Sequence, residues 1–167
     1  DLTGSAYRRM GGSVLPNHVT IRSETPRGAT LRGPTSYPAQ GAIYPESNLF
    51  VMTTDDGDSN DIADDWEIYG LVLECDARQG APILVQFNNR GFRIVNNLIR
   101  PQYAEWHTHG IYLSSGTTYA TALRNFYIGH NDIELLAGQG SGIHSFSGEF
   151  DSAGTISGCH DGVVEYN

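Results

Sequence analysis

The residues best suited to proton-transfer chemistry lie in the second half of the chain. Five of the six histidines follow residue 105, and imidazole is the side chain whose charge most readily changes near neutral pH. Segments 110–113 and 142–145 share a pattern in which isoleucine faces inward, so we expect Tyr112 and His144 side by side on an outward face, roughly 4.8 Å apart. His109 lies close to the turn before them. A phenol and an imidazole placed in this way can act as an acid/base pair; the alternative is an ordinary surface stack.

Aromatic and basic side chains accompany this cluster. Aromatic faces suit stacking against sugar rings, and a guanidinium can bind a carboxylate through two hydrogen bonds. The aromatic candidates are Trp106, Tyr103, Tyr119 and Tyr127, and the basic ones are Arg90, Arg93, Arg100 and Arg124. The expected catalytic residues are Tyr112, His144, His109 and Arg100, and the expected substrate-binding residues are Trp106, Tyr103, Arg93, Arg124 and His107. Two alternatives stay open: the aromatic residues only cover the fold, and Arg93 belongs to a row of salt bridges between Glu67 and Tyr127.

An acidic stretch offers a metal site. Residues 55–67 hold seven carboxylates, which repel one another unless a cation or water screens them. Oxygen ligands fall close to the spacing of a twelve-residue calcium loop, at Asp56, Asp58, Asn60, the Ile62 carbonyl, Asp64 and Glu67. Asp61 stands where such a loop has glycine, and a solvated loop is the alternative. Glu105, His107 and His109 are candidates for a transition metal, because His-x-His on an extended segment puts both rings on one side.

Short strands must position these groups. Apolar segments are separated by Gly, Asn, Ser and Asp turns, with almost nothing at helical period. One series aligns Ile68, Ile94 and Ile128, then Leu73, Ile99 and Ile133; a second aligns Ile83, Ile111 and Ile143; and a further copy from Val163 places Asn167 with Asn131 and Asn97. Strands this short bury their inward face only by stacking on the next turn of a repeat. We therefore expect a parallel β-solenoid with an asparagine ladder, since asparagine tolerates a sharp bend and can bond its equivalents above and below.

This pattern resembles the right-handed parallel β-helix superfamily, the pectate-lyase-like fold. The resemblance rests on Asn17-His18-Val19-Thr20-Ile21-Arg22, Val95-Asn96-Asn97-Leu98-Ile99, His109-Gly110-Ile111-Tyr112-Leu113 and Gly140-Ser141-Gly142-Ile143, and it covers nearly the whole chain. It implies an all-β, right-handed parallel β-helix of roughly five coils. We expect a single domain over 1–167, with loop excursions near 32–46, 55–65 and 100–109. An antiparallel sandwich or jelly roll is the alternative, because it also has many short strands.

The composition excludes several classes of function. The net charge is −9 and the chain has no lysine, so a phosphate-binding nucleic-acid protein is not expected, and chemistry that needs a lysine is excluded. No apolar run approaches the roughly 20 residues of a membrane span, and no signal peptide is visible. Residues 1–32 carry five arginines against two acids, whereas the remainder carries five against seventeen. Cys75 and Cys159 are expected to be small buried residues, with a disulfide as the alternative.

The resemblance implies a polysaccharide-active protein, extracellular or at the cell surface. The expected activity is lyase-type β-elimination on a uronic-acid glycan, for which the family's lyases use an Arg or Lys base and often calcium. Alternatives are a hydrolase or epimerase of the same fold, although the paired-Asp motif of the polygalacturonases is not matched here, and a non-catalytic glycan-binding or tail protein. Because uncapped solenoid ends are adhesive, we also expect a fragment of a longer helix or self-association through an end.

Overall fold

The computed structural model arranges the chain in four parallel sheets. It describes residues 7–8, 18–32, 49–53, 62–75, 81–102, 108–115, 122–146 and 158–167. Sheet C contains β2 (Thr20–Arg22), β6 (Glu67–Tyr69), β10 (Arg93–Val95), β14 (Tyr127–Gly129) and β18 (Val163–Glu165). Sheet A contains β3 (Ala29–Arg32), β7 (Leu71–Cys75), β11 (Leu98–Pro101) and β15 (Asp132–Ile133). Sheet B contains β1 (Tyr7–Arg8), β4 (Phe50–Thr53), β8 (Ile83–Gln86), β12 (Ile111–Ser114) and β16 (Ile143–Phe146), and sheet D contains β5 (Ala63–Asp64), β9 (Asn89–Arg90), β13 (Leu123–Arg124) and β17 (Cys159–His160).

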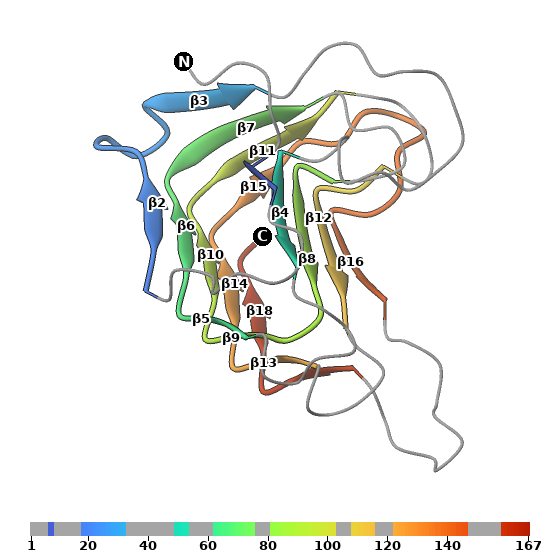
Figure 1. Cartoon of the computed structure of the whole chain (residues 1–167). Helices are drawn as coiled ribbons and strands as arrows, with labels where there is room; N and C mark the ends of the chain where they lie inside the picture. Colours follow the sequence, from blue (N-terminus) through green and yellow to red (C-terminus); the bar gives the residue numbers. More distant parts are fainter. Residues whose placement is uncertain are drawn as a thin grey trace.

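The chain visits the sheets in a fixed order. It passes through C, A, B and D and then returns to C one strand further along, so each passage forms what we call a rung. Figure 1 shows the four sheets around a common interior, with sheets C and B on opposite sides of it. Parallel neighbours require a long connection, and here the rest of the rung supplies it. The described residues form no helix, and the arrangement is compatible with a β-solenoid.

The strand registers confirm the predicted repeat. Ile68, Ile94 and Ile128 are direct partners in sheet C, and Val164 continues their column. The columns predicted from Leu73 in sheet A and from Ile83 in sheet B are also present. Every strand pair in the described part of the chain is parallel, so the antiparallel sandwich considered as an alternative is wrong.

All three predicted excursions overlap the sheets at their ends, and Arg32, the first residue of the excursion 32–46, ends β3. Ala63 and Asp64 form β5, although we placed them in the excursion 55–65. The reason is a fourth, short sheet that the two aligned series did not contain: Ala63 is fully buried as its inward residue. Likewise Arg100 and Pro101 complete β11. Residues 33–48, 54–61 and 103–107, which make up most of the three excursions, lie outside the described residues.

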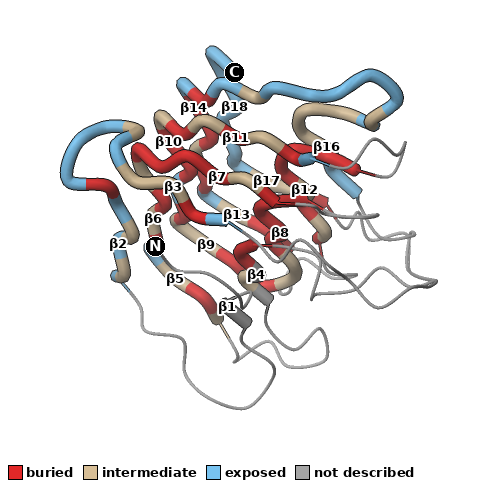
Figure 2. Tube along the Cα trace, turned by 90° about the horizontal axis from the view of Figure 1, so that it is seen from above, coloured by how far each residue is buried: buried red, intermediate tan, exposed pale blue. Residues whose placement is uncertain are grey.

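The interior is filled by apolar side chains that point inward from the strands. Inward-facing isoleucine and leucine residues of sheets A, B and C are almost completely buried in the middle rungs, as Figure 2 shows. Where sheet D meets sheet C, Trp66, Phe92 and Phe126 stack with centroid distances of 4.8 and 4.9 Å and nearly parallel rings. Repetition of the same residue type at the same level therefore gives a packed core without any helix.

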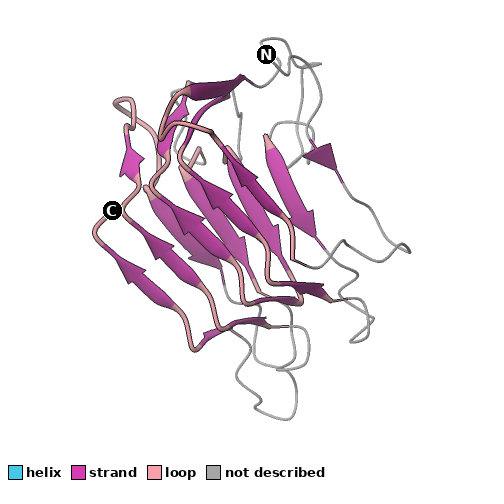
Figure 3. Cartoon of the chain, turned by 90° about the vertical axis from the view of Figure 1, so that its left-hand side faces the viewer, coloured by secondary structure: helices cyan, strands magenta, loops and turns pink. Residues whose placement is uncertain are grey.

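An asparagine ladder lies at the bend from sheet C to sheet A, as predicted. Asn97 Nδ2 donates to Asn131 Oδ1 at 3.0 Å, and Asn131 Nδ2 donates to Asn167 Oδ1 at 2.8 Å. The residue before each ladder position is left-handed, with φ of 57° at both Asn96 and His130. This conformation turns the chain within two residues, and the buried amides satisfy the backbone groups that the bend exposes. Figure 3 shows the resulting close stacking of the sheet C strands.

The two cysteines do not form a disulfide. Cys75 is buried at the end of β7 in sheet A, and Cys159 is half-buried in β17 of sheet D. They therefore act as small core residues rather than as a disulfide. Burial raises the pKa of the Cys159 thiol, which disfavours its thiolate.

Candidate functional site

Three aromatic rings meet at sheet B. Tyr112 on β12 and His144 on β16 are direct register partners, and their ring centroids are 5.0 Å apart at an angle of 22°. The His109 ring lies 4.4 Å from the His144 ring and 5.6 Å from the Tyr112 ring. The centroids thus form a compact triangle, so all three predicted side chains come together. Tyr112 and His144 are half-buried on the outer face, because their neighbours Ile111 and Ile143 point into the core.

His109 is held by the next rung. Its ring is buried, with 6% of the residue exposed. The Ser141 backbone N–H donates to His109 Nδ1 at 3.0 Å, and the Ser141 hydroxyl lies 3.1 Å from the same nitrogen. Because Nδ1 accepts a hydrogen bond from the backbone N–H, the ring proton of neutral His109 is on Nε2. His109 is therefore fixed in orientation and tautomer beneath the His144 ring.

Close backbone packing allows this contact. A side chain at Gly110 would place its Cβ 2.6 Å from the Gly142 carbonyl oxygen, so only glycine lets these two rungs approach. We did not single out Ser141 or this glycine contact from the sequence. A signal existed, because the register that aligns Ile111 with Ile143 also aligns His109 with Ser141.

The Tyr112 hydroxyl lies in a partly dehydrated environment. Burial raises the pKa of Tyr112 above its ordinary value, because the charged phenolate is poorly solvated there. The phenol therefore keeps its proton at neutral pH. That makes Tyr112 a proton donor rather than an acceptor in any chemistry at this face.

Most connections between sheet B and its neighbours are long, with the exception of Phe87 and Asn88, which join β8 to β9. Residues 33–48, 76–80 and 103–107 lie between strands of sheets A and B, and residues 54–61, 116–121 and 147–157 lie between strands of sheets B and D. By contrast, only one or two residues join sheet C to sheet A in the rungs that begin with β6, β10 and β14, although six join β2 to β3. Long connections on a rigid scaffold commonly carry functional residues. The predicted substrate-binding residues Trp106, Tyr103 and His107, together with Glu105 and Tyr119, belong to these connections and lie outside the described residues.

Arg100 is on sheet A and is occupied by carboxylates. Its Nε and Nη2 donate to the two Glu134 oxygens at 2.7 and 3.3 Å, and Nη1 donates to Glu74 at 3.4 Å. The hydrogen bond and charge of Glu134 raise the pKa of Arg100, and the hydrogen bond and charge of Arg100 lower the pKa of Glu134. Arg32 also pairs with Glu74, at 2.9 Å. Arg100 is thus part of an alternating surface row of charges, which sequence spacing alone did not indicate.

The other two predicted arginines lie on other faces. Arg93 is on sheet C, where it pairs with Glu67 at 3.0 Å and lies over the Tyr127 ring at 5.0 Å. This is the row of salt bridges that we kept as an alternative, on the side of the interior opposite sheet B (Figure 1). Arg124 is on sheet D, in register with Arg90. The structure therefore does not gather Arg93, Arg100 and Arg124 around Tyr112 and His144.

The two described members of the predicted calcium set also face arginines. Asp64 lies 3.7 Å from Arg90, and Glu67 lies 3.0 Å from Arg93. Asp56, Asp58 and Asn60 lie outside the described residues. Among the residues that are described, no group of three or more His, Cys, Asp or Glu side chains is placed to hold a metal ion.

Comparison of the chain with protein-family models, with curated proteins and with solved structures finds no match. No helix in the described ranges is long and apolar enough to span a membrane. The geometry of the site is therefore the basis for assigning a function.

Proposed function

We propose that the protein cleaves a uronic-acid-containing polysaccharide by β-elimination on the outer face of sheet B. The observation that supports it is the contact of the Tyr112 and His144 rings at 5.0 Å, with His109 against both. Convergence of three titratable rings on one face is what an acid/base site needs, and a mere spacer has no use for it. The proposal includes a right-handed parallel β-helix and an extracellular or cell-surface location, both from the resemblance to that superfamily.

We assign His144 the role of base and Tyr112 the role of acid. The His144 imidazole takes the proton from the carbon α to the uronate carboxylate. The electron pair left there forms a double bond to the β carbon, as the bond from that carbon to the glycosidic oxygen breaks. Tyr112, whose raised pKa keeps its proton in place at neutral pH, donates that proton to the departing oxygen. No water is consumed, and the products are an unsaturated uronate end and a free hydroxyl.

The uronate carboxylate must be neutralised for its α proton to become acidic. Arg100 of sheet A is the predicted cation for this role, and it would have to leave Glu134 to do so. The predicted calcium set Asp56, Asp58, Asn60, Asp64 and Glu67 includes residues of sheets D and C rather than sheet B, so we propose that calcium bound there stabilises the fold and does not contact the uronate. Asp64 and Glu67 would then bind the ion in place of their present partners, Arg90 and Arg93. Calcium that binds only the folded chain raises its melting temperature in a concentration-dependent way. If millimolar calcium leaves the melting curve where a chelator leaves it, the acidic segment is only solvated.

The activity is tested by incubating the chain with alginate, pectate and glycosaminoglycans, with and without calcium. Elimination produces a conjugated double bond, so ultraviolet absorbance should rise with at least one of these glycans. A hydrolase of the same fold would release reducing ends with no such absorbance. Glycan binding with neither product would identify a non-catalytic binding protein and would overturn the proposal.

Two tyrosines provide a matched pair of variants. Tyr112→Phe removes the proposed acid but keeps the ring stack, and we expect turnover to fall by about 10² to 10⁴. Tyr127→Phe removes a hydroxyl on sheet C, where it donates to Glu165 at 3.0 Å, and turnover should stay unchanged. His144→Ala should lower turnover as Tyr112→Phe does, with little change in stability because the side chain is half-exposed. Full activity in Tyr112→Phe would remove Tyr112 from the mechanism.

A further inference from the structure

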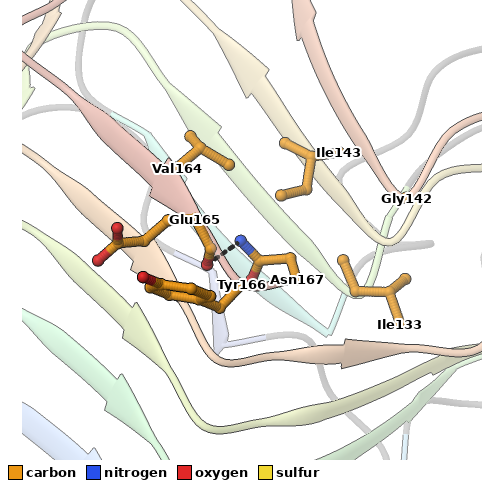
Figure 4. Close-up of a pocket in the computed structure, with 7 residues that line it drawn as sticks. All are labelled: Ile133, Gly142, Ile143, Val164, Glu165, Tyr166 and Asn167. Carbon is orange, nitrogen blue, oxygen red and sulfur yellow. Dashed lines mark hydrogen bonds between the residues drawn. The ribbon is translucent and has the colours of Figure 1, made fainter.

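The C-terminal end of the stacked sheets carries the exposed apolar surface of the described residues. All of their large exposed hydrophobic side chains lie there: Leu135, Leu136, Phe146, Val163, Val164 and Tyr166. Val164 is 51% exposed, although it continues the column of Ile128, which is fully buried. Beside it, a hollow of about 440 Å³ is lined by Ile133, Ile143 and Tyr166 among others (Figure 4). Val164 thus has the position of a core residue, but among the described residues no further strand covers it.

The opposite edge of sheet C has a complementary set of residues. β2 forms that edge, and its residues begin the same three columns that β18 continues. The columns start at Thr20, Ile21 and Arg22 and reach Val163, Val164 and Glu165. An apolar residue therefore stands at both ends of the inward column. The third column has a cation at one end and a carboxylate at the other.

We propose that a second copy of this chain docks head to tail on the C-terminal end, with its β2 pairing in parallel beside β18. The inward column would continue from Val164 to Ile21 of the second copy, which covers both side chains. Glu165 would come beside Arg22 of the second copy, at the strand spacing of roughly 4.8 Å. Parallel pairing is also the geometry of every other strand pair in the described part of the chain.

The strand order of sheet B is compatible with the same docking. β1 pairs with β4, which belongs to the rung of β2, so β1 lies one rung beyond β2. β16 belongs to the same rung as β14, which is the rung before β18 in chain order. When β2 of the second copy adds to β18, its β1 falls directly beside β16. Two sheets on opposite sides of the interior would thus be continued at once, without a missing strand in either.

Charge favours this polarity over a symmetric tail-to-tail contact. The first 32 residues carry five arginines against two acids, whereas the rest of the chain carries five against seventeen. Of the described acids near the C-terminal end, Asp132 and Glu134 are paired with Arg27 and Arg100, so Asp161 and Glu165 contribute most to its negative charge. Opposite charges steer and align two surfaces, whereas two acidic ends repel each other.

The docking has a consequence for the proposed catalytic face. Arg8 of β1 occupies the column that contains Leu84, Tyr112 and His144. The second copy would therefore bring its Arg8 position next to His144. This consequence depends on the proposed function, whereas the docking itself does not, and self-association is measured without any substrate.

Sedimentation of the chain at increasing concentration tests the docking. A head-to-tail contact does not close on itself, so the average mass should rise from the 18.2 kDa monomer past that of a dimer. Glu165→Arg and Arg22→Glu should each weaken the association about tenfold, because each puts like charges in contact. Mixed in equal amounts, the two variants should associate as the unchanged chain does, since every contact between them again joins opposite charges.

Val164→Asp should abolish the association and leave the melting temperature almost unchanged, because this side chain is exposed in the single copy. Arg93→Glu, which makes the same charge change in the middle of sheet C, should leave the association constant as it is. A chain that stays monomeric at every concentration overturns the proposal. So does an association that Arg22→Glu leaves unchanged, because Arg22 then takes no part in the contact.

Discussion

Replacing Asn97 with alanine removes the first member of the asparagine ladder, and we expect the free energy of unfolding to fall by about 3 kcal/mol. Asn97 is fully buried. Its Oδ1 accepts the Leu71 N–H at 3.0 Å, and its Nδ2 donates to the Ile68 carbonyl at 3.1 Å and to Asn131 Oδ1 at 3.0 Å. Each hydrogen bond contributes about 1 kcal/mol net, and a buried donor left unsatisfied costs about 1–3 kcal/mol. The loss is a large share of a typical total of roughly 5–15 kcal/mol.

Urea unfolding followed by circular dichroism measures this loss. With a denaturant slope of about 2 kcal/mol/M, the midpoint for Asn97→Ala should fall by about 1.5 M. The matched control is Asn96→Gly, one residue earlier, where φ is 57° and glycine fits without strain. That variant should stay within about 0.5 kcal/mol of the unchanged chain. A loss below about 1 kcal/mol for Asn97→Ala, or an equal loss for both variants, would refute the view that the side-chain amide supports the bend.

Three more outcomes are expected. Phe92→Ala removes the middle ring of a fully buried aromatic stack and should lower stability by about 3–5 kcal/mol, which an unchanged melting temperature would contradict. Gly110→Ala places a Cβ 2.6 Å from the Gly142 carbonyl oxygen, so the two rungs must separate; a melting temperature equal to that of the unchanged chain would show that they need not. The raised pKa of Tyr112 stabilises the folded chain at pH values below the ordinary tyrosine value of 10.0. This contribution is lost as the pH rises from that value through the folded pKa. The free energy of unfolding, measured across this pH range, should therefore fall less steeply in Tyr112→Phe than in the unchanged chain.

The sequence determined the stacking of the strands and much of the site. A strand alternates its side chains between two faces, and a repeat at constant register brings equivalent positions together. The columns through Ile68 and Ile83, the ladder at Asn97 and the contact of Tyr112 with His144 could all be derived from these two regularities. They are local properties of the chain, so a pattern of residues is sufficient to predict them.

Which faces the remaining residues share depends on how the four sheets are arranged in the folded chain. Arg93, Arg100 and Arg124 fall on three different sheets, because the angles between sheets depend on bends and on a short fourth sheet that the two aligned series did not contain. The sequence also did not indicate the hydrogen-bond partners of these side chains. Arg100 donates to Glu134, and His109 accepts a hydrogen bond from the Ser141 N–H. A guanidinium on a flexible stem can reach several neighbouring carboxylates, and the packed arrangement of the rungs selects among them. No spacing along the chain encodes that choice.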